Sequence, residues 1–463
     1  MDLNRILRFG QIAMVAVCLT APAAMFAAGE RSPSIDNRPL AERPTISASN
    51  LLDTTVADQF DQYLDGSFPL RDEAVKLNAF VARWLGDSTT DEVRIGRDGW
   101  LFLQSSTNQP CLDPPIDQVL AEAIDRINNV FVHVDKGLVL AVAPDKASIF
   151  SDRYGNDREL QCMLAAADRL QTLNTAIPLI TAWEETRAVA ALDESAYRRL
   201  DTHWTSVGAA ATARAIVDDI APGLWLPEYI VEVNRIDAAG DLALVLGREE
   251  SEPEIISAAD PAPGTTSNTP LLVVNRNGDT VEKRFSRSYR STWPGAIGGI
   301  SLLLGDSFGF RMNLLVAPYF AHIDTVDGVS PRGLEVRSLI NGADLIIREQ
   351  VQRSFVFDVV DRDLAAEFVI AFADRLEPFA VKIVCTSGPC RAVPEAAPKI
   401  GDRYVMATLA DGVQAANILV NGNVRVLDRD EPAGGWFIPA EVEMIIEGDP
   451  ALVTWSGAAV PLD

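Results

Sequence analysis

The stretch that decides the fold is residues 301–309, Ser-Leu-Leu-Leu-Gly-Asp-Ser-Phe-Gly. Its apolar half is typical of a strand buried on both faces, as in a parallel sheet covered by helices. Ser307 follows the carboxyl end of this strand, where open α/β sheets place their ligands and where backbone N–H groups can point at an oxyanion. An Asp-Ser pair after a strand is also common as a helix N-cap, so the motif alone does not establish a nucleophile.

Apolar runs alternate with helical patterns on both sides of this stretch. Strands are predicted at residues 138–142, 178–181, 300–304, 323–326 and 345–347, and helices at residues 51–85, 160–173, 207–220 and 364–379. Strands that alternate with helices predict a mainly parallel, doubly wound sheet with helices on both faces.

Two further regions interrupt or follow this α/β pattern. Residues 249–268 are rich in Glu, Pro, Ala and Thr, which predicts an exposed excursion, and the runs 271–274 and 281–285 around Asn277-Gly278 predict a hairpin. The C-terminal part predicts a small β-sandwich, with strands at residues 381–384, 404–409, 418–427, 435–438, 442–446 and 452–455.

Composition bounds the function before any motif is considered. The chain has 463 residues, 48% of them hydrophobic and 23% charged, which indicates a globular protein with two or three domains. Lys+Arg 40 against Asp+Glu 65 gives a net charge of −25, which argues against binding to nucleic acid phosphates or to anionic lipid.

The first residues resemble a targeting segment. Residues 1–28 combine a basic start, a short apolar run and small residues near Ala28, which is typical of a secretory signal, while the length of the run leaves an uncleaved N-terminal anchor open. Residues 29–50 read as an extended lead-in. We therefore expect a secreted protein that folds in an oxidising compartment.

Cysteine usage agrees with an oxidising compartment. Beyond Cys18 in the apolar run, four cysteines remain, and they allow three pairings. Proximity in the sequence favours Cys111–Cys162 and Cys385–Cys390. A metal site would need a close Cys pair or a nearby His, so we expect neither a metal nor a cofactor.

Only three histidines can serve as a base. His203 lies in Asp201-Thr202-His203-Trp204, where an Asp two residues before the His can bind Nδ1 and leave Nε2 for a serine. His133 is interpreted as structural and His322 as an edge residue beside a predicted strand.

Together, Gly-Asp-Ser-Phe at 305–308 and Asp-Thr-His-Trp at 201–204 resemble the SGNH-hydrolase-like domain of the periplasmic alginate O-acetyltransferases and related polysaccharide O-acetylation proteins. Further matches are residues 36–40, 68–72, 96–102 and 143–146. Ordinary SGNH esterases place the serine motif first, whereas here Asp201 and His203 precede Ser307, which is the permuted order of the acetyltransferases.

The resemblance implies an SGNH-like catalytic domain over residues 51–365 and a small C-terminal β-rich domain over 366–463. This second domain resembles a carbohydrate-binding module, and the alternative is a structural appendage or a contact with the secretion complex. It implies Ser307 as nucleophile, His203 as base and Asp201 as the orienting acid. The backbone N–H of Ser307 is one expected oxyanion donor, and the second is unassigned.

The activity implied is periplasmic transfer of an acetyl group through an acyl-serine to hydroxyls of an alginate-like exopolysaccharide. A membrane-bound acyltransferase would supply the acetyl group, and other export proteins are expected partners. Two alternatives stay open: an SGNH-type acetyl esterase, and a non-catalytic polysaccharide-binding scaffold of an export complex.

The segment at residues 283–293, just before the serine strand, concentrates four basic residues and three aromatic rings in an acidic chain. Arg forks bind carboxylates and aromatic faces pack on sugar rings, so Arg287, Tyr289, Arg290 and Trp293 are candidate substrate-binding residues. The alternative is a solvated edge hairpin whose basic residues discourage edge pairing.

Overall fold

The computed structural model describes residues 92–107, 117–155, 157–192, 196–274, 280–327, 331, 334–361 and 364–379, a few positions before residue 64, and the backbone of strands beyond residue 379. The predicted lead-in and nearly all of the predicted signal segment and first helical region lie outside these residues. Among the residues described, no helix is both long enough and apolar enough to cross a membrane.

The described chain divides into two compact units. The first comprises Met1–Gln104, Arg198–Thr202 and Asp237–Pro253, and the second comprises Ser105–Tyr197, His203–Ile236 and Glu254–Asp463. In the first unit, strands β1 (Val93–Ile95) and β2 (Leu101–Leu103) pair antiparallel. They form a small apolar core with helix α11 (Asp241–Val245).

A seven-stranded sheet organises the second unit, counted over the described residues, in the order β4-β3-β11-β9-β10-β8-β7. The five strands from β4 to β10 are parallel, and β8 and β7 add an antiparallel hairpin. Their bounds are β3 (Gly137–Ala143), β4 (Leu179–Thr181), β7 (Thr266–Val274), β8 (Thr280–Ser291), β9 (Ile297–Gly305), β10 (Phe320–Asp327) and β11 (Leu345–Val351). The predicted doubly wound α/β sheet is confirmed.

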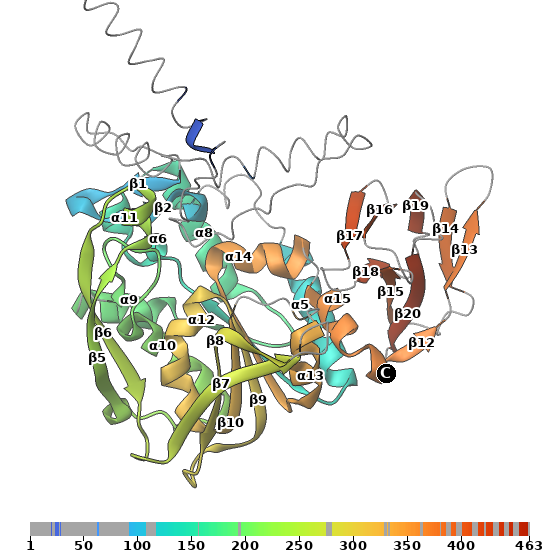
Figure 1. The fold of residues 1–463 in the computed structure, drawn as a ribbon. Helices are drawn as coiled ribbons and strands as arrows, with labels where there is room; N and C mark the ends of the chain where they lie inside the picture. The colour runs from blue at the N-terminus through green and yellow to red at the C-terminus, as the bar shows by residue number, and fades with distance from the viewer. Residues whose placement is uncertain are drawn as a thin grey trace, which may run out of the picture. The chain divides into compact units, whose positions relative to one another are not determined.

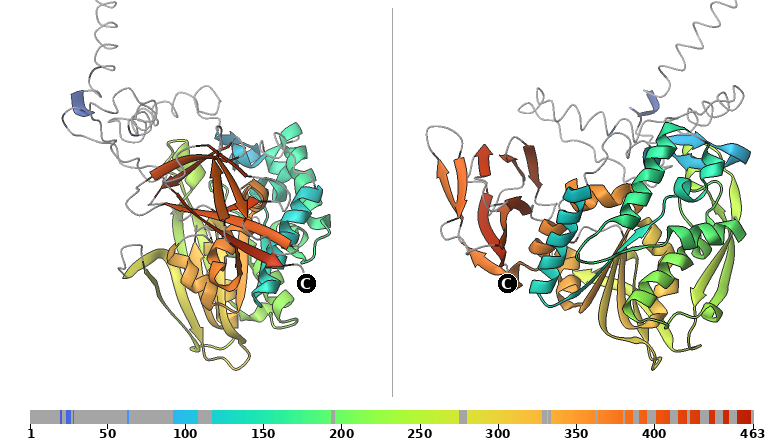
Figure 2. Two further views of the ribbon diagram at one scale, coloured as in Figure 1. Left: turned by 90° about the vertical axis from the view of Figure 1, so that its right-hand side faces the viewer. Right: turned by 180° about the vertical axis from the view of Figure 1, so that it is seen from behind.

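Helices cover both faces of this sheet (Figure 1). Their bounds are α5 (Asp117–His133), α6 (Lys146–Ile149), α7 (Ser151–Tyr154), α8 (Arg158–Thr172), α9 (Trp183–Leu192), α10 (Ser206–Ile220), α12 (Ser307–Val316), α13 (Leu334–Gly342), α14 (Gln352–Val356) and α15 (Leu364–Ala371). The chain runs from β9 to β10 through α12 and back from β10 to β11 through α13. Because such crossovers are right-handed, α12 and α13 lie on opposite faces. Figure 2 draws the sheet and its helices from two further sides.

Packing fixes these helices against the sheet. Helix α10 lies beside α12, while α15 packs against α5 through the Phe131 and Phe368 rings, whose centroids are 4.7 Å apart. The strand β9 is buried from Ser301 to Gly305, as its apolar run requires. Ser307 is thereby held at the carboxyl end of a central strand.

Three sequence expectations for this unit are wrong. The expected excursion at 249–268 contains β6 (Ser251–Ala259), which pairs with β5 (Ile230–Ala239). Glu254 of β6 is buried. The hydrogen bonds between the two strands thus form in spite of the polar composition of this segment. Of the helix expected at 364–379, α15 and a short 3-10 helix (Ala373–Arg375) form, and β12 (Glu377–Phe379) follows. His322 is not an edge residue, because its strand β10 lies between β9 and β8. The His322 Nε2 lies 3.2 Å from Asp324 Oδ1.

The C-terminal part is built of strands, as expected. Over the described residues they form one sheet in the order β12-β20-β15-β18 and another in the order β13-β14-β19-β16-β17. Their bounds are β13 (Val381–Cys385), β14 (Cys390–Pro394), β15 (Gly401–Leu409), β16 (Ala415–Val420), β17 (Asn423–Asp428), β18 (Gly435–Ile438), β19 (Met444–Glu447) and β20 (Val453–Pro461). The predicted single run at 418–427 is a hairpin of β16 and β17, and the sequence pattern missed β14.

Candidate active site

The turn from β9 into α12 presents Ser307 to solvent. Asp306 is the N-cap: its Oδ1 accepts a hydrogen bond from the Phe308 N–H at 2.8 Å, and its Oδ2 accepts one from the Val351 N–H of β11 at 2.9 Å. The N-cap reading of Asp306 is thus confirmed, and it coexists with an exposed Ser307. Ser307 is the first residue of α12, where N–H groups lack intrahelical partners and the helix dipole favours negative charge.

His203 meets this serine from a segment about a hundred residues earlier in the chain. Its Nε2 lies 2.7 Å from Ser307 Oγ, which is hydrogen-bond distance. The neighbouring Trp204 donates from its indole Nε1 to the Phe308 carbonyl at 2.9 Å, and the His203 and Phe308 rings are 5.1 Å apart. These contacts fix the imidazole segment to the first turn of α12. The geometry lets Nε2 accept the serine proton.

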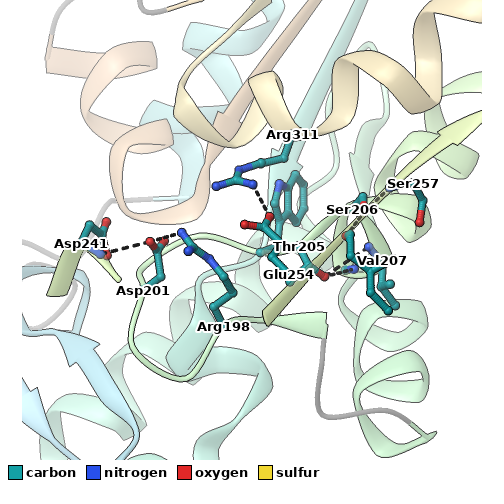
Figure 3. A network of polar contacts seen from close by, with 12 residues as sticks. Arg198, Asp201, Thr205, Ser206, Val207, Asp241, Glu254, Ser257 and Arg311 are labelled. Carbon is teal, nitrogen blue, oxygen red and sulfur yellow. Dashed lines mark hydrogen bonds and ion pairs between the residues drawn. The ribbon is translucent and has the colours of Figure 1, made fainter. Parts of the chain in front are cut away.

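Asp201 belongs to the first unit and is 2% exposed there. Its Oδ2 pairs with Arg198 and accepts a hydrogen bond from the Asp241 N–H at 3.1 Å (Figure 3). Arg198 in turn donates to the Ala239 carbonyl at 3.1 Å. The carboxylate is therefore rigidly held within its unit, and its predicted action on Nδ1 of His203 stays a prediction.

A buried ion pair beside Phe308 was missed as a feature of the site. Asp145 follows β3, is 2% exposed, and accepts hydrogen bonds from the Arg353 backbone N–H at 2.9 Å and from the Arg353 guanidinium. That guanidinium lies 5.2 Å from the centre of the Phe308 ring. Burial raises the pKa of Asp145, and Arg353 opposes the shift. The sequence signal for this pair was an Asp that follows a buried strand by two positions, after Pro144.

A cavity of about 280 Å³ lies along α12. Arg287 and Tyr289 of β8 line it, as do Phe310, Arg311 and Leu314, which follow Ser307 at helical positions i+3, i+4 and i+7 and so share its side of the helix. The remaining lining residues are Ser206, Glu254, Ile256, Asn268 and Asn313. Arg311 forms an ion pair with the buried Glu254 (Figure 3), and burial raises the pKa of Tyr289.

Two of the four candidate substrate-binding residues are not among the residues that line this cavity. Arg290 is exposed and alternates to the other face of β8, where it lies opposite His322. Trp293 packs its ring between Tyr229 and Tyr319, at centroid distances of 6.2 and 6.1 Å. The sequence pattern could not separate the faces because it did not place β8 inside the sheet.

The cysteines are partly placed. Cys162 on α8 is disulfide-bonded, while its expected partner Cys111 lies outside the described residues. The register of β13 and β14 sets Cys385 directly opposite Cys390. Both pairings stay predictions.

With this geometry in hand, the chain can be compared with known proteins. Residues 93–271 match the family described as the SGNH hydrolase-like domain of the acetyltransferase AlgX. Over this segment the chain is similar to the AlgX-type SGNH hydrolase-like family. Asp201 and His203 lie inside the matched segment, and Ser307 lies beyond it. The SGNH-like domain thus has the α/β fold that the motifs implied.

Relatives by sequence are two proteins named "Probable alginate O-acetylase AlgJ". The one from Pseudomonas putida is 25% identical over 247 residues, which cover 51% of this chain and 62% of the relative. The one from Pseudomonas aeruginosa is 27% identical over 180 residues, covering 37% and 44%. The alignments therefore span less than two thirds of the length of these relatives.

Solved structures were also compared. AlgX of Pseudomonas aeruginosa superposes with a TM-score of 0.44 at 13% identity, covering 79% of this chain and 94% of that one. The O-acetyltransferase domain of Pseudomonas putida AlgJ gives 0.37 at 16% identity, covering 58% and 99%. PatB1 of Bacillus cereus gives 0.43 at 13%, covering 58% and 98%.

Proposed function

We propose that this protein is a polysaccharide O-acetyltransferase that works through an acyl-serine on Ser307. The observation that carries the proposal is the 2.7 Å distance from His203 Nε2 to Ser307 Oγ, at the solvent-exposed start of a helix. The AlgX-type family match over residues 93–271 and the AlgJ relatives support acetyl transfer over other serine chemistry.

In the first half-reaction, His203 Nε2 takes the Ser307 proton as Oγ attacks the acetyl carbonyl. The negative oxygen that develops is stabilised by the Ser307 N–H at the positive end of α12. His203 then gives its proton to the leaving group. In the second half-reaction, His203 takes the proton of a sugar hydroxyl, which attacks the acyl-serine. The tetrahedral intermediate then expels Ser307 Oγ, which takes the proton back from His203, and Asp201 orients the imidazole throughout.

The cellular location and the partners are inferred from the same family resemblance. We infer a periplasmic protein, with a polysaccharide acceptor, a membrane-bound acyltransferase as acetyl source, and contacts with other export proteins. The acceptor sugar would occupy the cavity along α12, with Arg287 facing its acidic group and Tyr289 its ring.

The test is an acetyl-ester assay with and without an oligosaccharide acceptor. A transferase forms acetylated sugar that mass spectrometry detects. Release of free acetate alone, unchanged by the acceptor, would identify the esterase alternative. Failure to form an acetyl-enzyme, together with retained polymer binding, would identify the scaffold.

Arg287→Ala should raise KM for an anionic oligosaccharide about tenfold, because a charge-assisted hydrogen bond is lost, while hydrolysis of a small acetyl ester is unchanged. Arg290→Ala is the matched control, since it removes the same charge from the opposite face of β8. Added salt should weaken the difference between the two variants. Equal KM values in both variants would contradict acceptor binding in the cavity.

The C-terminal strands are proposed to bind carbohydrate. A chain that ends at Leu376 should keep ester hydrolysis but bind polymer less tightly, as pull-down with insoluble polysaccharide would show. The end is set before β12 because this strand pairs with β20 and would otherwise lose its partner. Unchanged polymer affinity would make these strands structural.

A further inference from the structure

Glu349 is a buried acid directly behind the serine turn. It lies on β11, between β3 and β9, and is 0% exposed. Neither carboxyl oxygen has a hydrogen-bond partner of normal geometry among the described residues, and the Asp306 backbone N–H is only a weak one. On the opposite face of the same strand, Arg348 is paired with Asp358 at 3.0 Å. Native proteins rarely bury a carboxyl group without partners, because its desolvation is costly.

Two glycines make room for this carboxyl group. A Cβ at Gly309 would lie 2.6 Å from Glu349 Oε2, and a Cβ at Gly305 would lie 3.0 Å from the same atom. Gly305 and Gly309 flank Asp306, Ser307 and Phe308. The Glu349 carboxyl group therefore lies against the backbone on both sides of the turn that carries the nucleophile.

The charge state of this group follows from its surroundings. Burial raises the pKa of Glu349 well above its ordinary value of 4.5, and the Asp306 and Asp327 carboxylates raise it further. Arg348 and the Asp306 backbone N–H lower the pKa of Glu349. Tyr197 is a further titratable group that interacts electrostatically with Glu349. An ionised Glu349 would oppose the oxyanion on Ser307 by like-charge repulsion.

We propose that Glu349 is a positioning residue whose neutral carboxyl group fills the space behind the Gly305–Gly309 turn and holds Ser307 in place. The catalytic part of this inference rests on the proposed role of Ser307. The packing part does not. A negative charge at Glu349 would both loosen the turn and weaken oxyanion binding.

Size complementarity gives the first test. Gly309→Ala should lower kcat for acetyl-ester hydrolysis roughly tenfold or more, because the new methyl group collides with the Glu349 carboxyl. In the Glu349→Ala background the same change should cost much less, since the space is vacated and alanine favours the helix. Gly298→Ala on β9, whose new Cβ would have nothing within 4 Å, is the control for a glycine replaced in open space. Additive effects of the Gly309 and Glu349 changes would overturn the proposal.

Ionisation gives the second test, with a readout that does not depend on activity. Because the folded pKa is raised, the folded state binds more protons than the unfolded state above pH 4.5, so stability falls as pH rises from there towards the raised pKa. Glu349→Gln keeps the shape without the ionisation. Its thermal midpoint should fall less with rising pH than that of the unsubstituted protein, and its kcat should stay within about twofold at neutral pH.

Parallel stability curves for Glu349→Gln and the unsubstituted protein would overturn the neutral assignment. A Gln variant as impaired in kcat as Glu349→Ala would instead require the acid itself and overturn the positioning role. If Ser307→Ala retained activity, the proposed function would fail while the stability curves and the double-substitution cycle, read by thermal midpoint, still decided the role of Glu349.

Discussion

Ser307→Ala should abolish acetyl-enzyme formation and lower acetyl transfer by roughly a thousandfold or more, because members of a catalytic set act as a unit. The fold should survive, since Ser307 is exposed and one hydroxyl group is a small change. Intact-mass spectrometry after incubation with an activated acetyl ester measures the adduct, and a thermal melt measures the fold.

His203→Ala should lose a similar factor, and the double variant should lose little more than either single variant. Ser338→Ala removes an exposed helical serine from α13 and serves as the matched control. Wild-type transfer by Ser307→Ala would disprove the nucleophile assignment. A much larger loss in the double variant would mean that the two residues act independently.

Arg353→Met should lower the free energy of unfolding by roughly 3–5 kcal/mol, because it leaves the buried Asp145 carboxyl without its charged partner. The Arg353 side chain is 15% exposed and that of Asp145 2% exposed, so solvent screens the pair only weakly. Denaturant unfolding monitored by tryptophan fluorescence gives the difference, read from the midpoint at constant slope.

Asp145→Asn in the Arg353→Met background should recover part of this loss, since an uncharged amide costs less to bury than a carboxylate without its partner. The rate of acetyl-ester hydrolysis by Arg353→Met should fall by more than the loss of folded protein accounts for, because Arg353 also packs over Phe308, next to the nucleophile. An undiminished free energy of unfolding in Arg353→Met would show that the pair is not a stabilising element.

Much of the fold was predictable because buried parallel strands are recognisable without neighbours. The apolar run before Ser307 becomes β9, and the runs at 138–142 and 345–347 become β3 and β11. The pairing of Ser307 with His203 also followed from the sequence, since few histidines compete for the role of base.

What the sequence pattern could not supply is pairing between distant strands. β6 reads as a polar excursion because its partner, β5, is itself mostly exposed, so neither strand shows an apolar signature. The neighbours of β8 in the sheet could not be predicted for the same reason. The sequence therefore did not show which of Arg287 and Arg290 faces the cavity. Glu349 was missed because a lone acid in a strand shows its environment only once Gly305 and Gly309 are placed beside it.

The two bonds of the Asp306 carboxylate limit which parts of this site can move during turnover. One oxygen holds the first turn of α12 and the other holds the end of β11, so the serine cannot shift unless the central strand shifts with it. Substrates must then enter and products leave through movements of side chains around the serine, such as the His203 imidazole, rather than through a movement of the helix. The amide hydrogens of Phe308 and Val351, which this carboxylate accepts, should accordingly exchange with solvent only when the sheet itself opens, and acylation should leave their exchange rates unchanged.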